Sequence, residues 1–253
     1  MSFEEKYQKM KEGGLVLANI LKTLAKEIEP GKEYYYFEKR AEELILDSGM
    51  KPAFKNYQAP FAKRPYPYVL CFSVNEVIAH GYPEKNRYLK EGDVVSLDLG
   101  LINEGVYLDA AITVGVGRIE KSKENLINAT KQALEKSIKI CKAGIRTGDI
   151  GWEIEKIITD SGFKVIKNLC GHDIGEYLHG EMQIFNFGEP GEGDILEEGI
   201  FICLEPMASF DSEFGRQVDD YVFVTQYKDI ATHFEATILI KKNKSEIITP
   251  ILD

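Results

Sequence analysis

The chain has 253 residues, of which 44% are hydrophobic and 28% are charged, so it is long enough to bury a sizeable core. Its net charge of −10, with no basic run, argues against a general affinity for the nucleic-acid backbone. No apolar run reaches the roughly 18 residues that span a bilayer, and the acidic start MSFEEKYQKMKEGG does not resemble a signal peptide, so we expect a cytoplasmic protein without membrane contact.

The first part of the chain is expected to be helical and then irregular. Apolar residues at helical spacing predict two helices, the first ended by Pro30 and Gly31 and the second ended near Gly49. Four prolines in the next segment forbid regular structure and favour a surface or pocket-lining loop. The elements expected before the next hairpin are helices over 14–28 and 37–45, a loop over 52–67, a strand over 69–73 and a segment with His80 over 75–83.

A predicted hairpin over 94–117 carries one carboxylate on each strand, because both strands alternate apolar and polar residues. A turn centred on Asn103 and Glu104 would place Asp98 and Asp109 opposite each other on one face, about 5 Å apart. Like charges at that separation repel, so the pair needs a proton, a cation or water. A pair of divalent metal ions and a solvent-facing hairpin edge are the two interpretations.

The second half of the chain repeats the order of the first. The turn before the second helix of each pair and the end of that helix are both offset by the same amount, since 144 − 31 and 160 − 47 both give 113. This spacing suggests an internal duplication, with two quasi-symmetric halves and a ligand site in the cleft between them. The elements expected after the hairpin are helices over 126–141 and 149–162, an exposed loop over 185–199, and strands over 200–207, 220–225 and 232–240.

The domain organisation is expected to be simple. No linker, repeat array or low-complexity segment divides the sequence, so we expect one domain over residues 1–253, with halves at about 14–117 and 121–241. The four cysteines are scattered without a CxxC pair and are expected to be reduced.

Three further segments each carry a side chain that can bind a metal ion. His172 lies in a glycine-flanked segment, Glu205 ends an apolar strand, and Glu235 begins another. Taken singly, such residues are more often core histidines or solvated carboxylates. Together with Asp98 and Asp109, they make one imidazole and four carboxylates, which suits two divalent ions that share bridging carboxylates and activate one water.

This set and its spacing resemble methionine aminopeptidase of the short bacterial type, a family of pita-bread metallopeptidases. The resemblance runs from about residue 14 to residue 240 and implies an α+β fold, in which two quasi-symmetric halves of antiparallel sheet are backed by helices and the site lies in the central cleft. The matching segments are Asn75-Glu76-Val77, His80-Gly81-Tyr82-Pro83, Gly92-Asp93-Val94-Val95, Asp98, Asp109, Gly171-His172 with Ile174-Gly175, His179 with Gln183, Glu205-Pro206-Met207, and Glu235 with Thr237.

The resemblance assigns a role to each matched residue. It implies that Asp98 chelates one metal ion, that Asp109 and Glu235 bridge both ions, and that His172 and Glu205 complete the other. Glu205 would also act as general base and acid. The residues that contact the scissile carbonyl and the leaving side of the peptide would be His179 and His80, respectively.

The resemblance also implies a pocket for an unbranched thioether side chain. Its walls would be formed by Tyr66, Cys71 and Met207, and Tyr221 would take the place of a tryptophan at the rim. His233 matches no functional position of the family and is expected to be a strand residue near the site.

The chain departs from the family pattern beside the predicted ligands. The departures are expected to remove hydrogen bonds around the metal ligands, which tune affinity and activity, while leaving the ligands themselves intact. They are Asp173 in place of a glycine, Gly100 in place of a threonine, Ala110 and Ala111 in place of small hydroxyl residues, and Met182 in place of a proline.

The function implied by the resemblance is metal-dependent removal of initiator methionine when the second residue is small. Two divalent ions are expected as cofactors, and Co, Mn, Fe and Zn all fit the ligands. The partners would be the N-termini of peptides and nascent proteins, with transient ribosome contact left open. A compact single domain favours a monomer.

Two other functions are weighed against this one. A proline-directed aminopeptidase, similar to aminopeptidase P or prolidase, would share the fold, but such enzymes usually carry an additional N-terminal domain, and only 79 residues (80 − 1) precede His80. A catalytically inactive pita-bread binding module is the alternative from another class. Such a module is expected to lose metal ligands, whereas all five are present here.

Overall fold

The computed structural model describes residues 1–252 and contains, within that range, four helices and fifteen strands. The helices are α1 (Phe3–Lys26), α2 (Tyr34–Asp47), α3 (Lys121–Ile140) and α4 (Thr147–Asp160). The strands are β1 (Lys51–Pro52), β2 (Leu70–Val74), β3 (Val77–Ala79), β4 (Val94–Asn103), β5 (Val106–Gly115), β6 (Lys164–Val165), β7 (Cys170–Ile174), β8 (Gln183–Phe185), β9 (Phe201–Leu204), β10 (Met207–Ser209), β11 (Gly215–Gln217), β12 (Phe223–Thr225), β13 (Ala231–His233), β14 (Glu235–Ile240) and β15 (Ser245–Ile247).

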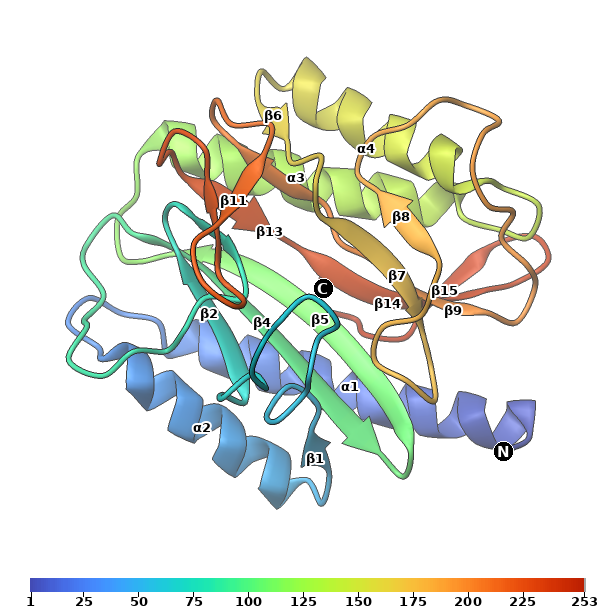
Figure 1. Ribbon diagram of the computed structural model, residues 1–253, viewed down its shortest axis with the longest axis horizontal. Helices are drawn as coiled ribbons and strands as arrows, with labels where there is room; N and C mark the ends of the chain where they lie inside the picture. The colour runs from blue at the N-terminus through green and yellow to red at the C-terminus, as the bar shows by residue number, and fades with distance from the viewer. Residues whose placement is uncertain (253) are drawn as a thin grey trace.

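A nine-stranded antiparallel sheet forms the centre of the molecule (Figure 1). Its strands follow the order β1-β4-β5-β14-β9-β7-β8, with β2 paired to β4 and β15 paired to β14. β14 therefore joins the strands of the first half to those of the second. Two three-stranded sheets, β13-β10-β6 and β11-β12-β3, accompany the large one. This combination of helices and antiparallel strands confirms the predicted α+β class.

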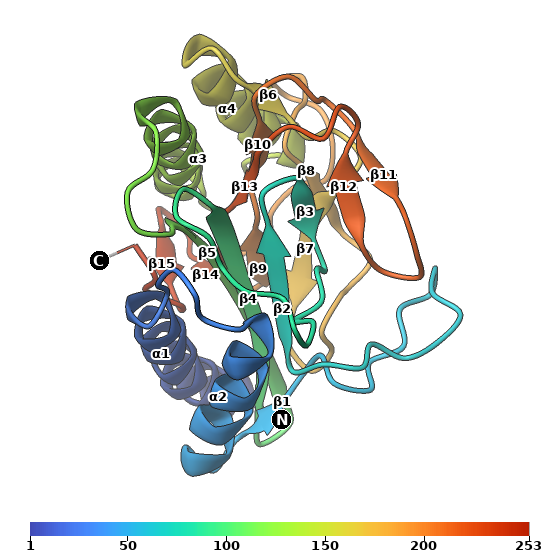
Figure 2. The same cartoon turned by 90° about the vertical axis from the view of Figure 1, so that its left-hand side faces the viewer.

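The helices α1 and α3 lie against one face of the large sheet, and the loops and the sheet β11-β12-β3 lie on the other side (Figure 2). A Cβ atom at Gly13 of α1 would lie 2.8 Å from Cδ2 of Leu108, so helix and strand are in close contact at this glycine. Neighbouring residues of a strand point to opposite faces of the sheet. Asp109 therefore points away from α1, into the uncovered side.

The first helix begins well before the predicted position. The apolar stripe predicted a helix over 14–28, whereas α1 starts at Phe3. Glu5 N–H donates to Oγ of Ser2, and the Glu5 carboxylate accepts from the Ser2 backbone N–H, which together form a capping box. The periodicity missed this part because most of its side chains face solvent.

The repeated spacing of the two helix pairs is present in the structure. α2 and α4 have 14 residues each and begin 113 positions apart (147 − 34). Each is followed by a glycine in the left-handed region, with φ of 78° at Gly49 and 86° at Gly162. These features support a duplication, and the division into two halves stays a prediction.

The central hairpin forms as predicted, but its turn lies one residue later in the chain than expected. The partner of each residue on the opposite strand is therefore shifted by two positions. Asn103 pairs with Val106, so the two-residue turn is Glu104-Gly105, with φ of 46° and 92°. Positive φ at both positions is the type I′ geometry that suits a twisted hairpin. As a result, Asp98 lies opposite Ala111, and Asp109 lies opposite Gly100. The two aspartates share a face as diagonal neighbours, and the prediction that they face each other directly was wrong.

Two predicted strands are each broken in two, at the same level of the fold. The predicted strand 200–207 is interrupted at Glu205 and Pro206, and the predicted strand 232–240 is interrupted at Phe234. Proline has no N–H to donate to a strand ladder, and Phe234 N–H donates to the Pro206 carbonyl across the gap. Before and after this point the chain belongs to different sheets. The double break brings Glu205 and Glu235 together.

A buried carboxylate that the sequence did not single out ties α2 to β2. Glu38 is 4% exposed, and its two oxygens accept hydrogen bonds from the backbone N–H groups of Val69 and Leu70 at 2.9–3.1 Å. Burial raises the pKa of Glu38, and the two backbone donors oppose that rise. Since β2 pairs with β4 along Asp98, Glu38 supports one wall of the site from behind.

We expect Glu38→Ala to lower the free energy of unfolding by about 2–5 kcal/mol, because it leaves two buried N–H groups without an acceptor. Glu38→Gln keeps one acceptor oxygen and should lose less. Denaturant unfolding of the three proteins measures the difference. Equal stability of the wild type and the alanine variant would show that α2 and β2 do not depend on this contact.

Candidate metal centre and substrate cavity

All eleven side chains predicted for the site line one cavity of about 520 Å³. A more open hollow of about 630 Å³ beside the start of α1 is lined by none of them. The eleven residues come from strands and loops of both halves of the chain. They are Tyr66, Cys71, His80, Asp98, Asp109, His172, His179, Glu205, Met207, Tyr221 and Glu235.

Three buried carboxylates meet in this cavity. Asp98, Asp109 and Glu235 offer oxygen atoms that lie within 4.8 Å of one another. One oxygen of each has no hydrogen-bond partner within residues 1–252. Burial raises the pKa of Asp98 to about 7 and raises the pKa values of Asp109 and Glu235 well above their usual range, where neighbouring carboxylates add to the rise. Buried, unpartnered carboxylates of this kind need protons or a cation.

His172 extends this group from β7. A backbone carbonyl can only accept, so Nδ1–H of His172 donates to the Asp173 carbonyl at 3.0 Å and leaves the Nε2 lone pair free. This Nε2 lies 3.8 Å from Oε1 of Glu205 and 4.0 Å from Oε1 of Glu235. Burial lowers the pKa of His172 to about 4, so the ring is neutral at pH 7. A neutral imidazole held by a carbonyl is the form that binds metal ions.

The distances in this cluster suit a shared cation. Nitrogen and oxygen ligands bind a divalent ion at about 2.0–2.2 Å, so two ligands of one ion lie roughly 3–4 Å apart. The separations of His172 Nε2 from the two glutamates fall in this range and are too long for hydrogen bonds. A set of carboxylate oxygens with one imidazole nitrogen matches divalent transition metals. The residues present therefore fit the metal ions that the sequence predicted.

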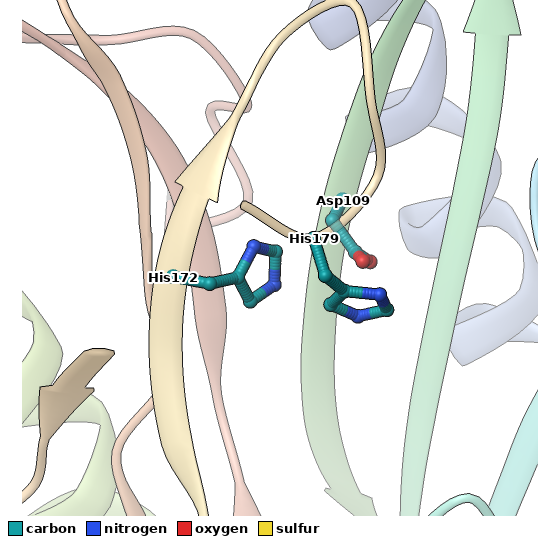
Figure 3. Close-up of side chains that lie close together, drawn as sticks. All are labelled: Asp109, His172 and His179. Atoms are coloured by element: carbon teal, nitrogen blue, oxygen red, sulfur yellow. The ribbon is translucent and has the colours of Figure 1, made fainter. Parts of the chain in front are cut away.

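His179 lies beside the cluster, on the loop that follows β7. Figure 3 shows the rings of His172 and His179 side by side, with the Asp109 carboxylate near them, and the two ring centroids are 4.4 Å apart. Nδ1 of His179 lies 2.9 Å from the Tyr57 hydroxyl. His179 is partly open to solvent at the mouth of the cavity. Desolvation by the surrounding cavity, with a smaller contribution from His172, lowers the pKa of His179, so the ring is neutral at pH 7. If Tyr57 donates this hydrogen bond, Nε2 of His179 carries the proton and is a donor.

Tyr57 is a residue that the sequence did not single out. It lies in the loop 52–67, which was expected to be a surface or pocket-lining loop, and the four prolines of that loop were the available signal.

His80 occupies another wall, in a strained backbone conformation. Its φ is 57°, which non-glycine residues seldom adopt and which clusters at functional sites. Nδ1 of His80 lies 3.2 Å from the Tyr221 carbonyl, and because that oxygen only accepts, Nδ1 carries the proton. Burial lowers the pKa of His80. The remaining ring nitrogen is then an acceptor.

The predicted pocket residues form a buried wall of two tyrosine rings and two sulfur-containing side chains. Tyr66 and Cys71 are each 3% exposed and Met207 is 1% exposed. Tyr66 donates to the Gly81 carbonyl at 2.9 Å, and its ring lies 5.1 Å from that of Tyr221. The Tyr221 hydroxyl lies 2.8 Å from the Arg64 carbonyl, to which it can donate, so Tyr221 also holds the loop 52–67 in place. The hydroxyl groups of Tyr66 and Tyr221 thus form hydrogen bonds with backbone carbonyls and leave the rings to face the cavity.

One departure from the family pattern has a simple steric reason. A Cβ at Gly100 would lie 2.5 Å from Cε1 of Phe54, so any larger side chain would displace that ring. Phe54 is buried and lines the cavity. Gly100 therefore makes room for an aromatic wall that a threonine would not allow.

Two other departures, Asp173 and Met182, are coupled through one carboxylate. Met182 N–H donates to Oδ1 of Asp173 at 2.8 Å, a bond that a proline at this position could not make. The Tyr177 hydroxyl donates to Oδ2 of Asp173. A Cβ at Gly180 would lie 2.1 Å from the same carboxylate, so the chain passes directly over it. Asp173 thus closes the loop that carries His179.

We expect Asp173→Ala to lower kcat/KM for the release of methionine from a peptide about 10-fold. This factor corresponds to the loss of roughly one charge-assisted hydrogen bond. The alanine variant frees the loop 174–182, so amide hydrogen exchange there should become faster. Asp173→Asn keeps an acceptor for Met182 N–H and should restore most of the activity. Metal affinity is measured alongside, because a parallel loss of affinity would show that Asp173 acts on His172 and not on the loop.

Comparison with known proteins places the chain in a family. The model of metallopeptidase family M24 matches residues 8–241. The chain belongs to metallopeptidase family M24. It is similar to a methionine aminopeptidase of Mycoplasma capricolum subsp. capricolum, with 39% identity over 249 residues that cover 97% of this chain and 96% of the relative. It is also similar to the crystal structure of methionine aminopeptidase from Thermotoga maritima, with a TM-score of 0.92, 39% identity, and coverage of 97% of this chain and 96% of the other.

A more distant member of the fold is the prolidase from Pyrococcus horikoshii. It has a TM-score of 0.73 and 20% identity, and the match covers 97% of this chain but 62% of the prolidase. At this identity the likeness shows the fold alone. The predicted resemblance to methionine aminopeptidases, the pita-bread α+β fold and the assignment as a metallopeptidase are thereby confirmed. Within residues 1–252, no helix is long and apolar enough to cross a membrane.

Proposed function

We propose that this chain removes the N-terminal methionine from peptides and nascent proteins by metal-dependent hydrolysis. The observation that carries the proposal is a single cavity, in which a cluster of metal-binding side chains adjoins an enclosed pocket with aromatic and sulfur-containing walls. The names of its relatives support the same reaction.

The cofactor in this proposal is a pair of divalent ions. Asp98 would hold one ion, Asp109 and Glu235 would hold both, and His172 and Glu205 would complete the other. When bound, such a pair lowers the pKa of a water molecule towards neutrality and polarises a carbonyl oxygen.

The protein side chains carry the proton and orient the peptide. In the metal-free protein, burial and the charges of Asp109 and Asp98 raise the pKa of Glu205 well above its usual range. In the proposal Glu205 accepts the proton of the attacking water and delivers it to the leaving amine. Nε2–H of His179 donates to the oxygen on which charge develops. The free ring nitrogen of His80 accepts from an N–H on the leaving side of the peptide.

The pocket explains the choice of methionine in this proposal. An unbranched thioether is flexible and polarisable, and Cys71 and Met207 offer soft sulfur surfaces beside the rings of Tyr66 and Tyr221. A charged side chain on the first residue of the substrate would have to lose its hydration shell to enter this pocket, which disfavours acidic and basic first residues. A cytoplasmic location, a monomeric state and transient contact with the ribosome stay predictions.

Peptide hydrolysis tests the function directly. The protein is stripped of metal and supplied with Mn²⁺ or Co²⁺, and Met-Ala-Ser and Ala-Pro-Ala are offered as substrates. Release of methionine from the first peptide alone is expected, and only when metal is present. Cleavage before proline would assign the chain to the proline-directed peptidases. Failure to cleave either peptide, together with failure to bind metal, would support the inactive binding module.

A further inference from the structure

His233 presents an imidazole to the metal centre for which the family resemblance gives no role. It is the last residue of β13, next to the break before β14, and is 2% exposed. Neither Nδ1 nor Nε2 has a hydrogen-bond partner within residues 1–252. A buried polar group without a partner costs free energy, so the ring requires a partner that the described chain does not supply.

The position of His233 repeats that of His172. Its Nε2 lies 3.6 Å from Oε2 of Glu205 and 3.8 Å from Oε2 of Glu235. The Nε2 of His172 lies 3.8 Å and 4.0 Å from Oε1 of the same two glutamates. Each imidazole therefore faces one oxygen of both carboxylates, and the two imidazoles face different oxygens. All four separations are typical of atoms that share a metal ion.

We propose that His233 is a sixth ligand of the metal centre and binds a divalent ion through Nε2, together with Oε2 of Glu205 and Oε2 of Glu235. The inference rests on the proposed function, because it takes the metal centre as given. A second imidazole favours borderline ions such as Zn²⁺ and Fe²⁺ over Mn²⁺, which prefers oxygen ligands. In this proposal His233 thus sets the metal preference of the site.

The competing role for His233 is a direct hydrogen bond to Glu205. That bond would need Nε2–H as donor and a contraction from 3.6 Å to about 2.9 Å. It would also need a donor at Nδ1 to select this tautomer, and Nδ1 has no hydrogen-bond partner among the described residues. The two roles differ in whether Nε2 carries a proton or a metal ion when the centre is loaded.

Nitrogen NMR distinguishes these states, because the chain contains only four histidines. The full-length protein is labelled with ¹⁵N-histidine and loaded with ¹¹³Cd²⁺ as a spin-active substitute for Zn²⁺. A ligand nitrogen then shows a one-bond coupling to cadmium, and a protonated nitrogen shows a one-bond coupling to hydrogen. We expect cadmium coupling at Nε2 of both His172 and His233, assigned by single substitutions, and none at His80.

Metal affinity provides the second readout. His233→Gln preserves a polar side chain but replaces the strong nitrogen ligand, and His172→Gln and His80→Gln serve as the matched ligand and non-ligand controls. Zn²⁺ dissociation constants are measured by competition with a chromophoric chelator. Loss of even an outer partner of a metal ligand costs about 10–100-fold in affinity, so we expect His233→Gln to weaken Zn²⁺ binding by about 100-fold, close to His172→Gln. Mn²⁺ binding should weaken less.

The outcomes separate this inference from the proposed function. Cadmium coupling at His172 without coupling at His233 would overturn the inference and leave the metal centre intact. A protonated Nε2 at His233 in the loaded protein would make it a positioning residue for Glu205 and would equally overturn it. Coupling at neither ring would contradict the metal centre itself.

Discussion

Glu205→Gln should lower kcat for release of methionine from Met-Ala-Ser on the order of 10³-fold, within the 10²–10⁴-fold range of general acid–base catalysis. Glutamine keeps the size of the side chain and one oxygen for a metal ion, but it cannot accept and return a proton. The KM should change much less than kcat, because the pocket and the two histidines are untouched. Initial rates at saturating metal, with metal content measured on the same samples, give the result.

The control for this experiment is Glu176→Gln. Glu176 is exposed on the loop after β7, so it reports the effect of removing one carboxylate near the cavity without removing the proposed base. Its activity should match that of the wild type. If high metal concentration restored the kcat of Glu205→Gln, the proposal would be contradicted, because Glu205 would then act only as a metal ligand and not as a base.

In the metal-free protein the buried carboxylates should contribute less stability as the pH rises from about 5 to 8, opposite to the usual effect of paired carboxylates. The lowered pKa values of His172, His179 and His233 act in the other direction, but only below about pH 6.5, where the histidines of the unfolded chain are protonated. The pKa of Asp98 rises from 3.8 to about 7 on burial, so the folded protein retains a proton that the unfolded chain has already lost. Stability from this proton is complete below pH 4 and disappears as the pH passes 7. For Asp98 alone the change is on the order of 3 kcal/mol, and Asp109 and Glu235 shift in the same direction.

A bound cation replaces those protons, so added Mn²⁺ or Co²⁺ should raise the thermal midpoint most at pH 8 and least at pH 5. Thermal unfolding at several pH values, with chelator and with metal, measures both effects. Asp98→Asn provides the matched variant, since an amide never ionises. Without metal this variant should be more stable than the wild type at pH 8. Added metal should raise its thermal midpoint less than that of the wild type. Both proteins share the same histidines, so their difference isolates Asp98. A wild type whose metal-free stability does not fall relative to that of Asp98→Asn between pH 5 and pH 8 would contradict the assigned pKa shift.

The sequence located the residues that line the cavity better than it predicted the backbone that holds them. His172, Glu205 and Glu235 stand beside glycine or proline, or at the end of an apolar run, which are local signals that a reader of the sequence can see. The hairpin was also visible from its alternation. Its register was not, because Asn103-Glu104 and Glu104-Gly105 are both plausible turns, and a shift by one residue is decided by the twist of the finished sheet.

Other features depended on contacts between distant segments. The double break at Pro206 and Phe234 is a property of two strands together, and neither segment alone predicts it. The hydrogen bond between Asp173 and Met182 N–H is of the same kind, because it makes two departures from the family pattern support each other. The role of Tyr57 required the loop 52–67 to fold over the cavity and reach His179.

The place of β14 in the large sheet has a consequence for how the protein folds during its synthesis. β14 lies between β5 and β9, so residues 235–240 form the junction through which the strands of the two halves become one sheet. The proposed ligands Asp98 and Glu235 are far apart in the sequence, and such long-range contacts are slow to form because the intervening chain must first be ordered. During synthesis, a ribosome-bound chain without β14 can bury neither half against the other nor assemble its ligands. The proposed metal centre, which takes Glu235 as a ligand, can therefore be complete only after β14 has left the ribosome.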